Sequence, residues 1–256
     1  MFIEPTQTPY DLRFELFGTP VRVHPLFWLI TVLFGWDFLV ADGFAYLALW
    51  VVCVFLSILL HELGHVWAGK LFGTDGYIVL HGLGGLAVGA SDLSTRWKRV
   101  VVYLAGPLIQ IVGIWLPLWL WRRSLGDQWW DLTDKLRLFA AMLMMINLYW
   151  PLINLVPIWP LDGGKVAREL CTWLSPRQGM RWSLIVSIAT GTLLAVNSLV
   201  AINRGTPLIP HIPAGGWYFT LFFGILAYES YLLLTQLRQT QPWRYEEPDD
   251  RLPWER

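Results

Sequence analysis

Three residues of one pentapeptide have the types and spacing needed to activate water on a metal ion. Residues 61–65 read HELGH, and positions i and i+4 of a helix lie on one face, about one turn apart. His61 and His65 can therefore both direct an imidazole at one ion, while Glu62 reaches the same place without needing to ligate. Two histidine ligands, a metal-activated water and a glutamate base are the arrangement of zinc hydrolases.

The apolar surroundings of this pentapeptide strengthen the case that its ionisable residues are functional. The ten residues before it, 51–60, read VVCVFLSILL and are almost wholly apolar. Two histidines four residues apart on a soluble amphipathic helix are often simply solvated. Inside an apolar span, a carboxylate and two imidazoles without partners would be costly to bury, so ionisable groups there are functional by default. The sequence therefore favours a reaction site within a membrane.

A catalytic zinc ion usually has three protein ligands, so the chain must supply one more. The candidates elsewhere in the sequence are His24, His81, His211, Asp37 and Asp162. Asp162 has the most favourable context, in NLVPIWPLDGG at 154–164. Two prolines break the helix before it, and we expect Gly163 and Gly164 to release the backbone after it. The alternative is that this stretch is only a turn that ends a helix.

The other candidates have weaker contexts. His24 precedes Pro25 and is expected at the membrane interface, and Asp37 is expected to hydrogen-bond to a neighbouring helix. His81 lies in a glycine-rich loop that could approach the site. His211 lies in a proline-rich loop expected on the opposite side of the membrane.

The composition is that of an integral membrane protein. The 256 residues are 55% hydrophobic and 15% charged, with 17 tryptophans, whereas soluble domains are about 25% charged. The formal net charge is zero, which gives no indication of nucleic-acid binding. The two cysteines allow no disulfide framework. The N-terminal residues lack a basic segment followed by an apolar one, so no cleavable signal peptide is expected.

The expected fold is an α-helical polytopic membrane protein of about six transmembrane helices with a short membrane-associated β element. A span needs about 20 mostly apolar residues, and the expected spans are 25–41, 44–69, 100–121, 137–157, 183–203 and 216–237. After its proline-rich break, the fourth span is expected to continue into a helical piece at 165–174. Residues 1–237 then form one domain, followed by a polar tail at 238–256.

Two segments are expected to be β structure. Residues 10–23 alternate apolar and polar side chains around a Gly-Thr-Pro turn, which predicts a hairpin at the membrane face. Residues 77–90 hold four glycines, too many for a stable helix, and predict a β-like re-entrant loop. An edge strand near 82–86 could hold a substrate extended. Gly84 and Gly85 are accordingly candidate substrate-binding residues.

The distribution of basic residues predicts the orientation of the chain. With six spans, the loops on the side of both termini carry more Lys and Arg than the loops on the other side, so both termini are expected in the cytoplasm. His61 lies 17 residues after Phe44, or about 26 Å along a helix at 1.5 Å per residue. The metal is therefore expected inside the membrane, displaced toward the cytoplasm.

HELGH at 61–65 together with NLVPIWPLDGG at 154–164 resembles the site-2 protease family of intramembrane zinc metalloproteases. Three further stretches are similar to that family: FGTPVRVH at 17–24, LGGLA at 83–87 and YLAGPL at 103–108. The resemblance covers most of residues 14–175. The sequence corresponds to a compact form, without the PDZ or CBS domain of many relatives.

The resemblance implies a role for each matching residue. His61, His65 and Asp162 would bind one zinc ion, and Glu62 would activate water. Asn154 would help to hold the substrate or the transition state, with Asn147 in a supporting part. Gln110 stands where the family often has Asn and keeps the amide, so we attach little weight to the difference.

The expected function is hydrolysis of peptide bonds within or next to transmembrane segments of substrate proteins in a prokaryotic cell membrane. The expected partners are the substrate and the lipid bilayer, and a second copy of the chain is a further candidate. One alternative is a non-catalytic relative that binds membrane proteins without cutting them. Another is a metal transporter, which would need polar residues along several spans. The spans offer few apart from the site: Asp37, Gln110, Asn147 and Glu229.

Overall fold

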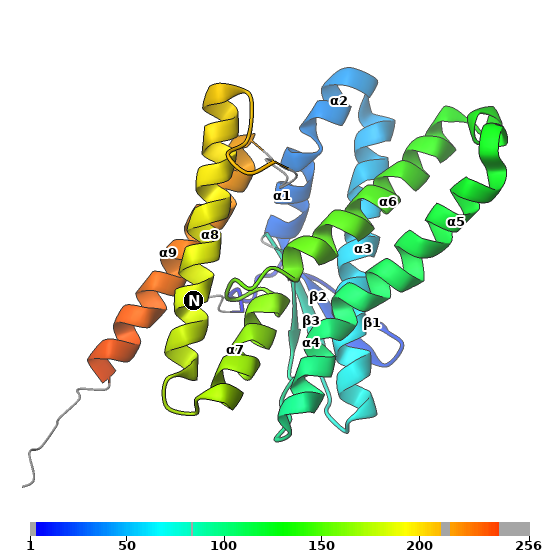
Figure 1. Cartoon of the computed structure of the whole chain (residues 1–256). Helices are drawn as coiled ribbons and strands as arrows, with labels where there is room; N and C mark the ends of the chain where they lie inside the picture. Colours follow the sequence, from blue (N-terminus) through cyan, green and yellow to red (C-terminus); the bar gives the residue numbers. More distant parts are fainter. Residues whose placement is uncertain (1–3, 83, 211–215, 241–256) are drawn as a thin grey trace, which may run out of the picture.

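A computed structural model of the chain describes residues 4–82, 84–210 and 216–240. Figure 1 shows long helices side by side, with a small sheet packed against one side of them. The candidate ligand His211 and nearly all of the expected polar tail lie outside the described residues. The expectation of a helical membrane protein with a short β element is confirmed.

The two expected β segments form one sheet. Its strands are β1 (Leu12–Leu16), β2 (Thr19–Val23), β3 (Tyr77–His81) and β4 (Gly84–Val88). The spatial order is β1-β2-β3-β4, with antiparallel pairing inside each hairpin. The hairpins join through parallel pairing of β2 with β3, where Val21 lies opposite Ile78. Strand β4 is therefore at one end of the sheet, with no strand on its outer side among the described residues.

The first expected span is divided into two helices, α1 (Pro25–Phe34) and α2 (Trp36–Asp42), which meet at Gly35. Trp50 packs against this junction, with its indole ring in the space beside Gly35. A Cβ added at Gly35 would lie 2.3 Å from Trp50 Cδ1. The indole Nε1 also donates a hydrogen bond to the Thr31 carbonyl, at 3.0 Å. The contact comes from another helix and has no signature in the sequence of the span itself.

The other five expected spans are each present as a helical stretch long and apolar enough to cross a bilayer. These stretches are α3 (Phe44–Leu71), Arg96–Asp131, α6 (Asp134–Asn154), α8 (Gly179–Arg204) and the 216–237 part of α9 (Gly216–Thr240). The second stretch contains α4 (Arg96–Gln110), a π-helical segment (Ile111–Trp115), α5 (Leu116–Leu125) and a final 3₁₀ turn (Gly126–Asp131).

The fourth span ends where the proline-rich stretch begins. Helix α6 stops at Asn154, residues 155–161 are irregular, and the shorter helix α7 runs from Asp162 to Leu174. The expected helical piece after the break is thus confirmed, but it begins at the aspartate itself. Asp162 is the first residue of α7 rather than the end of the fourth span.

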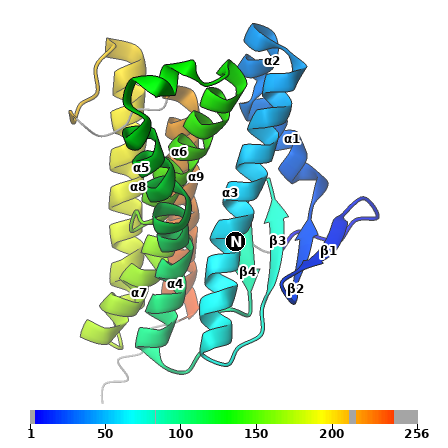
Figure 2. The same ribbon diagram turned by 90° about the vertical axis from the view of Figure 1, so that its right-hand side faces the viewer.

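Helix α3 occupies the centre of the molecule. Figure 2 shows the sheet, α1 and α2 on one side of it and the helices from α4 onward on the other. Its buried side chains Leu63 and Val66 belong to the same apolar cluster as Val23, Ile78 and Leu80 of the sheet. Every residue of HELGH is buried. The helix that carries the histidines is therefore fixed on two sides.

Candidate metal centre

The histidines of α3 project from one face of the helix and are almost wholly enclosed. His61 is 2% exposed and His65 5% exposed. Their ring centroids are 4.8 Å apart, with the ring planes at 81°. The i, i+4 spacing of the pentapeptide thus places both rings beside one point, as a helix requires.

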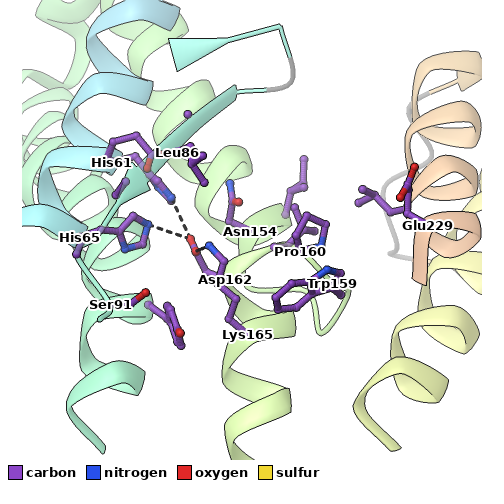
Figure 3. Close-up of a pocket in the computed structure, with 18 of the residues that line it drawn as sticks. His61, His65, Leu86, Ser91, Asn154, Trp159, Pro160, Asp162, Lys165 and Glu229 are labelled. Carbon is purple, nitrogen blue, oxygen red and sulfur yellow. Dashed lines mark hydrogen bonds and ion pairs between the residues drawn. The ribbon is translucent and has the colours of Figure 1, made fainter. Parts of the chain in front are cut away.

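Asp162 reaches the same point from the start of α7. Its Oδ2 lies 3.0 Å from His61 Nε2 and 3.2 Å from His65 Nε2. One ligand atom of each of the three residues lies within 4.8 Å of the others. Figure 3 shows the aspartate pointing from its helix toward both rings. Residues about 100 positions apart in the chain are therefore brought together as one donor set.

The two glycines after Asp162 allow α7 to pack tightly on the irregular segment before it. A Cβ added at Gly163 would lie 2.1 Å from the Leu155 carbonyl oxygen, and one at Gly164 would lie 2.3 Å from that of Ile158. Both glycines lie inside α7. The expectation that they release the backbone is wrong, because they serve close approach within a regular helix.

Glycines also allow α3 and α4 to approach each other beside His65. A Cβ added at Gly64 would lie 2.8 Å from the Ala105 carbonyl oxygen. A Cβ added at Gly106 would lie 2.4 Å from His65 Nε2. Gly106 belongs to the YLAGPL stretch, so the absence of a side chain there leaves room for the imidazole.

The hydrogen bond on the far side of each ring fixes which nitrogen carries hydrogen. His65 Nδ1 lies 2.7 Å from the Val102 carbonyl oxygen. A carbonyl can only accept, so Nδ1 is the donor. In the neutral ring, Nε2 then has its lone pair toward Asp162. This is how proteins orient a metal-ligating histidine.

A buried amide does the same for His61. Gln110 Nε2 donates to the Ser57 carbonyl at 3.0 Å and to Asn147 Oδ1 at 3.1 Å. The carbonyl of Ser57 fixes the orientation of the amide, so Gln110 Oε1 is the atom that faces His61 Nδ1, at 2.7 Å. That oxygen accepts, and the lone pair of the neutral ring is again on Nε2.

Gln110 and Asn147 lie behind the histidines, away from the cavity. The resemblance places Asn147 in support of the substrate site and gives Gln110 no particular role. Both are 0% exposed, and neither lines the cavity described below. Asn147 donates to Ser57 Oγ at 2.8 Å and to the Leu143 carbonyl at 2.9 Å. The structure thus puts it behind His61 rather than beside a substrate. Sequence reasoning gave Gln110 too little weight, although an amide within an apolar span always needs partners.

The donor set fits a zinc ion. It offers two imidazole nitrogens with fixed lone pairs and one carboxylate oxygen, the number and types of protein ligand found in catalytic zinc sites. The far side of each ring is already hydrogen-bonded to the protein. His61, His65 and Asp162 are the residues that would hold the ion.

Glu62 lies beside this donor set without being part of it. It is 5% exposed and lines the same cavity as the two histidines. Strand β4 passes directly over it. A Cβ added at Gly85 would lie 2.4 Å from Glu62 Oε1 and from Glu62 Cγ. A glycine at position 85 therefore lets the strand and the carboxylate occupy adjacent space.

A cavity of about 540 Å³ opens from these residues. Gly85, Leu86 and Ala87 of β4 form one wall, and α9 contributes the opposite wall, which includes Glu229. Asn154 lines the cavity, and its Nδ2 donates one hydrogen bond to the Trp150 carbonyl at 3.0 Å. Gly84 is not among the lining residues; its Cα faces the Trp150 ring.

The remaining described candidates do not join the donor set. His24 caps α1, where its Nδ1 accepts from the Leu26 amide at 3.2 Å. Asp37 is exposed in the first turn of α2. His81 lines the cavity. Among the described candidates, Asp162 is thus the one that meets both histidines.

Comparison with known proteins agrees with this geometry. The model of peptidase family M50 matches residues 129–196. The chain is 29% identical over 195 residues to a zinc metalloprotease of Methanocaldococcus jannaschii, covering 75% of this chain and 53% of the relative. It is 30% identical over 215 residues to stage IV sporulation protein FB of Bacillus subtilis, covering 82% of this chain and 66% of the relative. The chain thus spans about half of the first relative and about two thirds of the second.

A solved structure has the same fold. The site-2 protease of Methanocaldococcus jannaschii superposes with a TM-score of 0.55 at 22% identity, over 88% of this chain and 95% of that one.

Proposed function

Because the chain belongs to peptidase family M50, the site-2 protease family, we propose that it is an intramembrane zinc metalloprotease. Its reaction is hydrolysis of peptide bonds within or next to transmembrane segments of other proteins. One observation carries the proposal: His61, His65 and Asp162 converge at a buried point, with the Glu62 carboxylate beside it.

Each residue of the site has a distinct task in this reaction. His61, His65 and Asp162 would hold the zinc ion, which when bound would supply a positive charge that polarises the scissile carbonyl and makes a bound water more acidic. Glu62 accepts the proton that water loses during attack and returns it to the leaving amine. Asn154 lines the cavity and has a second amide hydrogen with which to hold the substrate backbone or the developing oxyanion.

We place the site within the membrane, nearer to its cytoplasmic face. The spacing from Phe44 to His61 along α3 corresponds to about 26 Å, in a hydrocarbon core about 30 Å thick. Basic residues follow the site on both helices that supply ligands, Lys70 on α3 and Arg168 on α7. By the positive-inside rule, we assign this end and both termini to the cytoplasm.

Strand β4 is suited to hold a substrate in extended form. A helical substrate hides its carbonyls in hydrogen bonds, so it must unwind before it can be cut. The outer edge of β4 has free backbone groups and can add the unwound segment as a further strand. Gly85 would then bring that segment close to Glu62, with α9 closing the other side of the cavity.

Comparative membrane proteomics tests the function. Cells that carry Glu62→Gln in place of the wild-type protein should accumulate at least one uncut membrane protein. The matched control is Glu15→Gln, which neutralises an exposed glutamate of β1 and should leave processing unchanged. Identical processing in the Glu62→Gln and wild-type cells would argue for a binding protein that does not cut.

A further inference from the structure

The two carboxylate oxygens of Asp162 have different partners. Oδ2 faces the Nε2 atoms of both histidines, at 3.0 and 3.2 Å. Oδ1 accepts from the ammonium of Lys165, with Nζ at 3.2 Å. Figure 3 shows the lysine on the same helix as the aspartate. The carboxylate thus presents one oxygen to the histidine pair and one to a cation.

The position of Lys165 is not explained by the local preferences of a helix. It is the fourth residue of α7, and the N-terminal turn of a helix disfavours a positive charge. A lysine in such a place normally extends its ammonium into water. Here the side chain is only 29% exposed, and Nζ lies 5.6 Å from the centre of the Tyr103 ring. The fold therefore keeps this cation beside the aspartate.

The pairing limits how Asp162 can bind a metal. A carboxylate can ligate through one oxygen or through both. A charge-assisted hydrogen bond to Oδ1 favours ligation through Oδ2 alone. A catalytic zinc site needs three protein ligands and one open position for water and substrate, and a second oxygen of Asp162 would compete for that position.

We propose that Lys165 is a positioning residue that restricts Asp162 to ligation through one oxygen and so keeps a coordination position open. The inference rests on the proposed function, because it assumes that His61, His65 and Asp162 hold a metal ion. It adds a residue on the cavity wall that acts on the metal through Asp162 and decides how many ligand atoms the protein supplies.

Cobalt substitution tests the inference, because the visible spectrum of Co²⁺ reports coordination number. Purified full-length wild type, stripped of metal and loaded with Co²⁺, should show the strong absorption of a four-coordinate ion. Lys165→Met keeps the length of the side chain without its charge, and Lys165→Gln keeps polarity without charge. Both should show the weaker absorption of a five-coordinate ion, and Lys165→Arg should keep the wild-type spectrum.

Competition with a chelator gives a second measurement on the same samples. Removing a hydrogen-bond partner of a metal ligand typically changes metal affinity about 10–100-fold, so we expect a change of that size in the two neutral variants. The matched control is Lys98→Met, whose ammonium lies over the rings of Phe72 and Trp97 instead. It should match wild type in both measurements.

The possible results separate the inference from the function on which it rests. A wild-type spectrum and affinity in both neutral variants would overturn the role of Lys165 while leaving the metal site intact. A five-coordinate spectrum in Lys165→Arg would overturn the role of the charge. Failure of the wild type to bind cobalt would contradict the metal site itself, and with it the proposed protease.

Discussion

The two sides of the donor set are built differently. On the inner side, the far nitrogens of His61 and His65 are held by Gln110 and by the Val102 carbonyl, deep between α3, α4 and α6. On the outer side, Asp162 arrives on a separate short helix and is paired with a partly exposed lysine. The cavity, and with it any substrate, lies on this outer side.

The difference separates two tasks. The hydrogen bonds that orient the histidines must stay fixed, whereas the groups around the cavity must leave room for a substrate. The inner side fixes the protonated nitrogen of each histidine through a fully satisfied, fully buried network. The outer side supplies the charge of Lys165 and borders the cavity. A change to a ligand or to a group paired with a ligand, on either side, should therefore alter metal binding, whereas a change confined to the cavity wall at Gly85 or to Glu62 should reduce catalysis and leave the metal bound.

Replacing Asp162 with Ala should have the largest effect, because it removes the ligand that the outer side contributes. We expect loss of bound zinc together with complete loss of cleavage, measured by metal analysis and by cleavage of a reconstituted substrate. Asp75→Ala changes an exposed aspartate and should preserve both. Zinc content equal to wild type in Asp162→Ala would show that the donor set is assigned wrongly.

Replacing Gly85 with Ala should affect catalysis without affecting metal. The added Cβ would occupy the space of Glu62 Cγ and Oε1, so the base must move. A displacement of about 1 Å can cost about 100-fold in rate, and we expect a loss of that order at unchanged zinc content. The control is Gly224→Ala in α9, where an added Cβ would meet nothing within 4 Å, and it should be nearly neutral. Full activity in Gly85→Ala would remove β4 from the site.

Replacing Gln110 with Met tests the inner side. The change leaves His61 Nδ1, Asn147 Oδ1 and the Ser57 carbonyl without their partner. We expect zinc affinity to fall about 10–100-fold, with a loss of stability of about 1–3 kcal/mol for each group left unpaired. Chelator competition and thermal unfolding measure the two effects. The control is Gln178→Met, which changes an exposed amide. If Gln110→Met bound zinc as tightly as Gln178→Met, Gln110 would not be needed to orient His61.

Replacing Asp11 with Asn should have the smallest effect, since it lies on neither side of the donor set. The Thr8 hydroxyl and Arg22 both donate to the Asp11 carboxylate, and they lower its pKa from 3.8 to about 2. A carboxyl with a lowered pKa in the folded state stabilises the fold above pH 3.8, and this contribution is lost as the pH falls toward 2.

Thermal unfolding from pH 7 to pH 2 tests this prediction. Wild type should be more stable than Asp11→Asn at pH 7, and the difference should vanish near pH 2. Zinc content and cleavage should stay at wild-type levels. A difference that does not depend on pH would show that the charge of Asp11 does not stabilise the N-terminal segment.

Much of the fold follows from local patterns. The apolar runs predicted the spans, the alternation at 10–23 predicted a hairpin, and the glycines at 77–90 predicted β structure. The parallel pairing of β2 with β3 has no local signal, because it joins strands more than 50 residues apart. The contact of Trp50 with Gly35 likewise joins residues of two different helices. Such contacts are set by tertiary packing.

In the candidate site, too, local sequence patterns predict some features and tertiary contacts determine the rest. The spacing of HELGH and the broken helix before Asp162 were sufficient to predict the three residues that converge. The partners behind them were not predictable, because hydrogen-bond direction depends on distant groups such as the Ser57 carbonyl. The resemblance implies a part for Asn147 in support of Asn154 at the substrate, whereas the structure places its amide against Gln110, behind His61.

The most direct test of the proposed function is the zinc content of purified Glu62→Gln, measured alongside cleavage of a reconstituted transmembrane substrate. Glu62 lies outside the donor set and has the position of the general base. The variant should therefore carry as much zinc per chain as wild type and cleave at least about 100-fold more slowly. Loss of zinc would make Glu62 a ligand, and undiminished cleavage would contradict its role as the base.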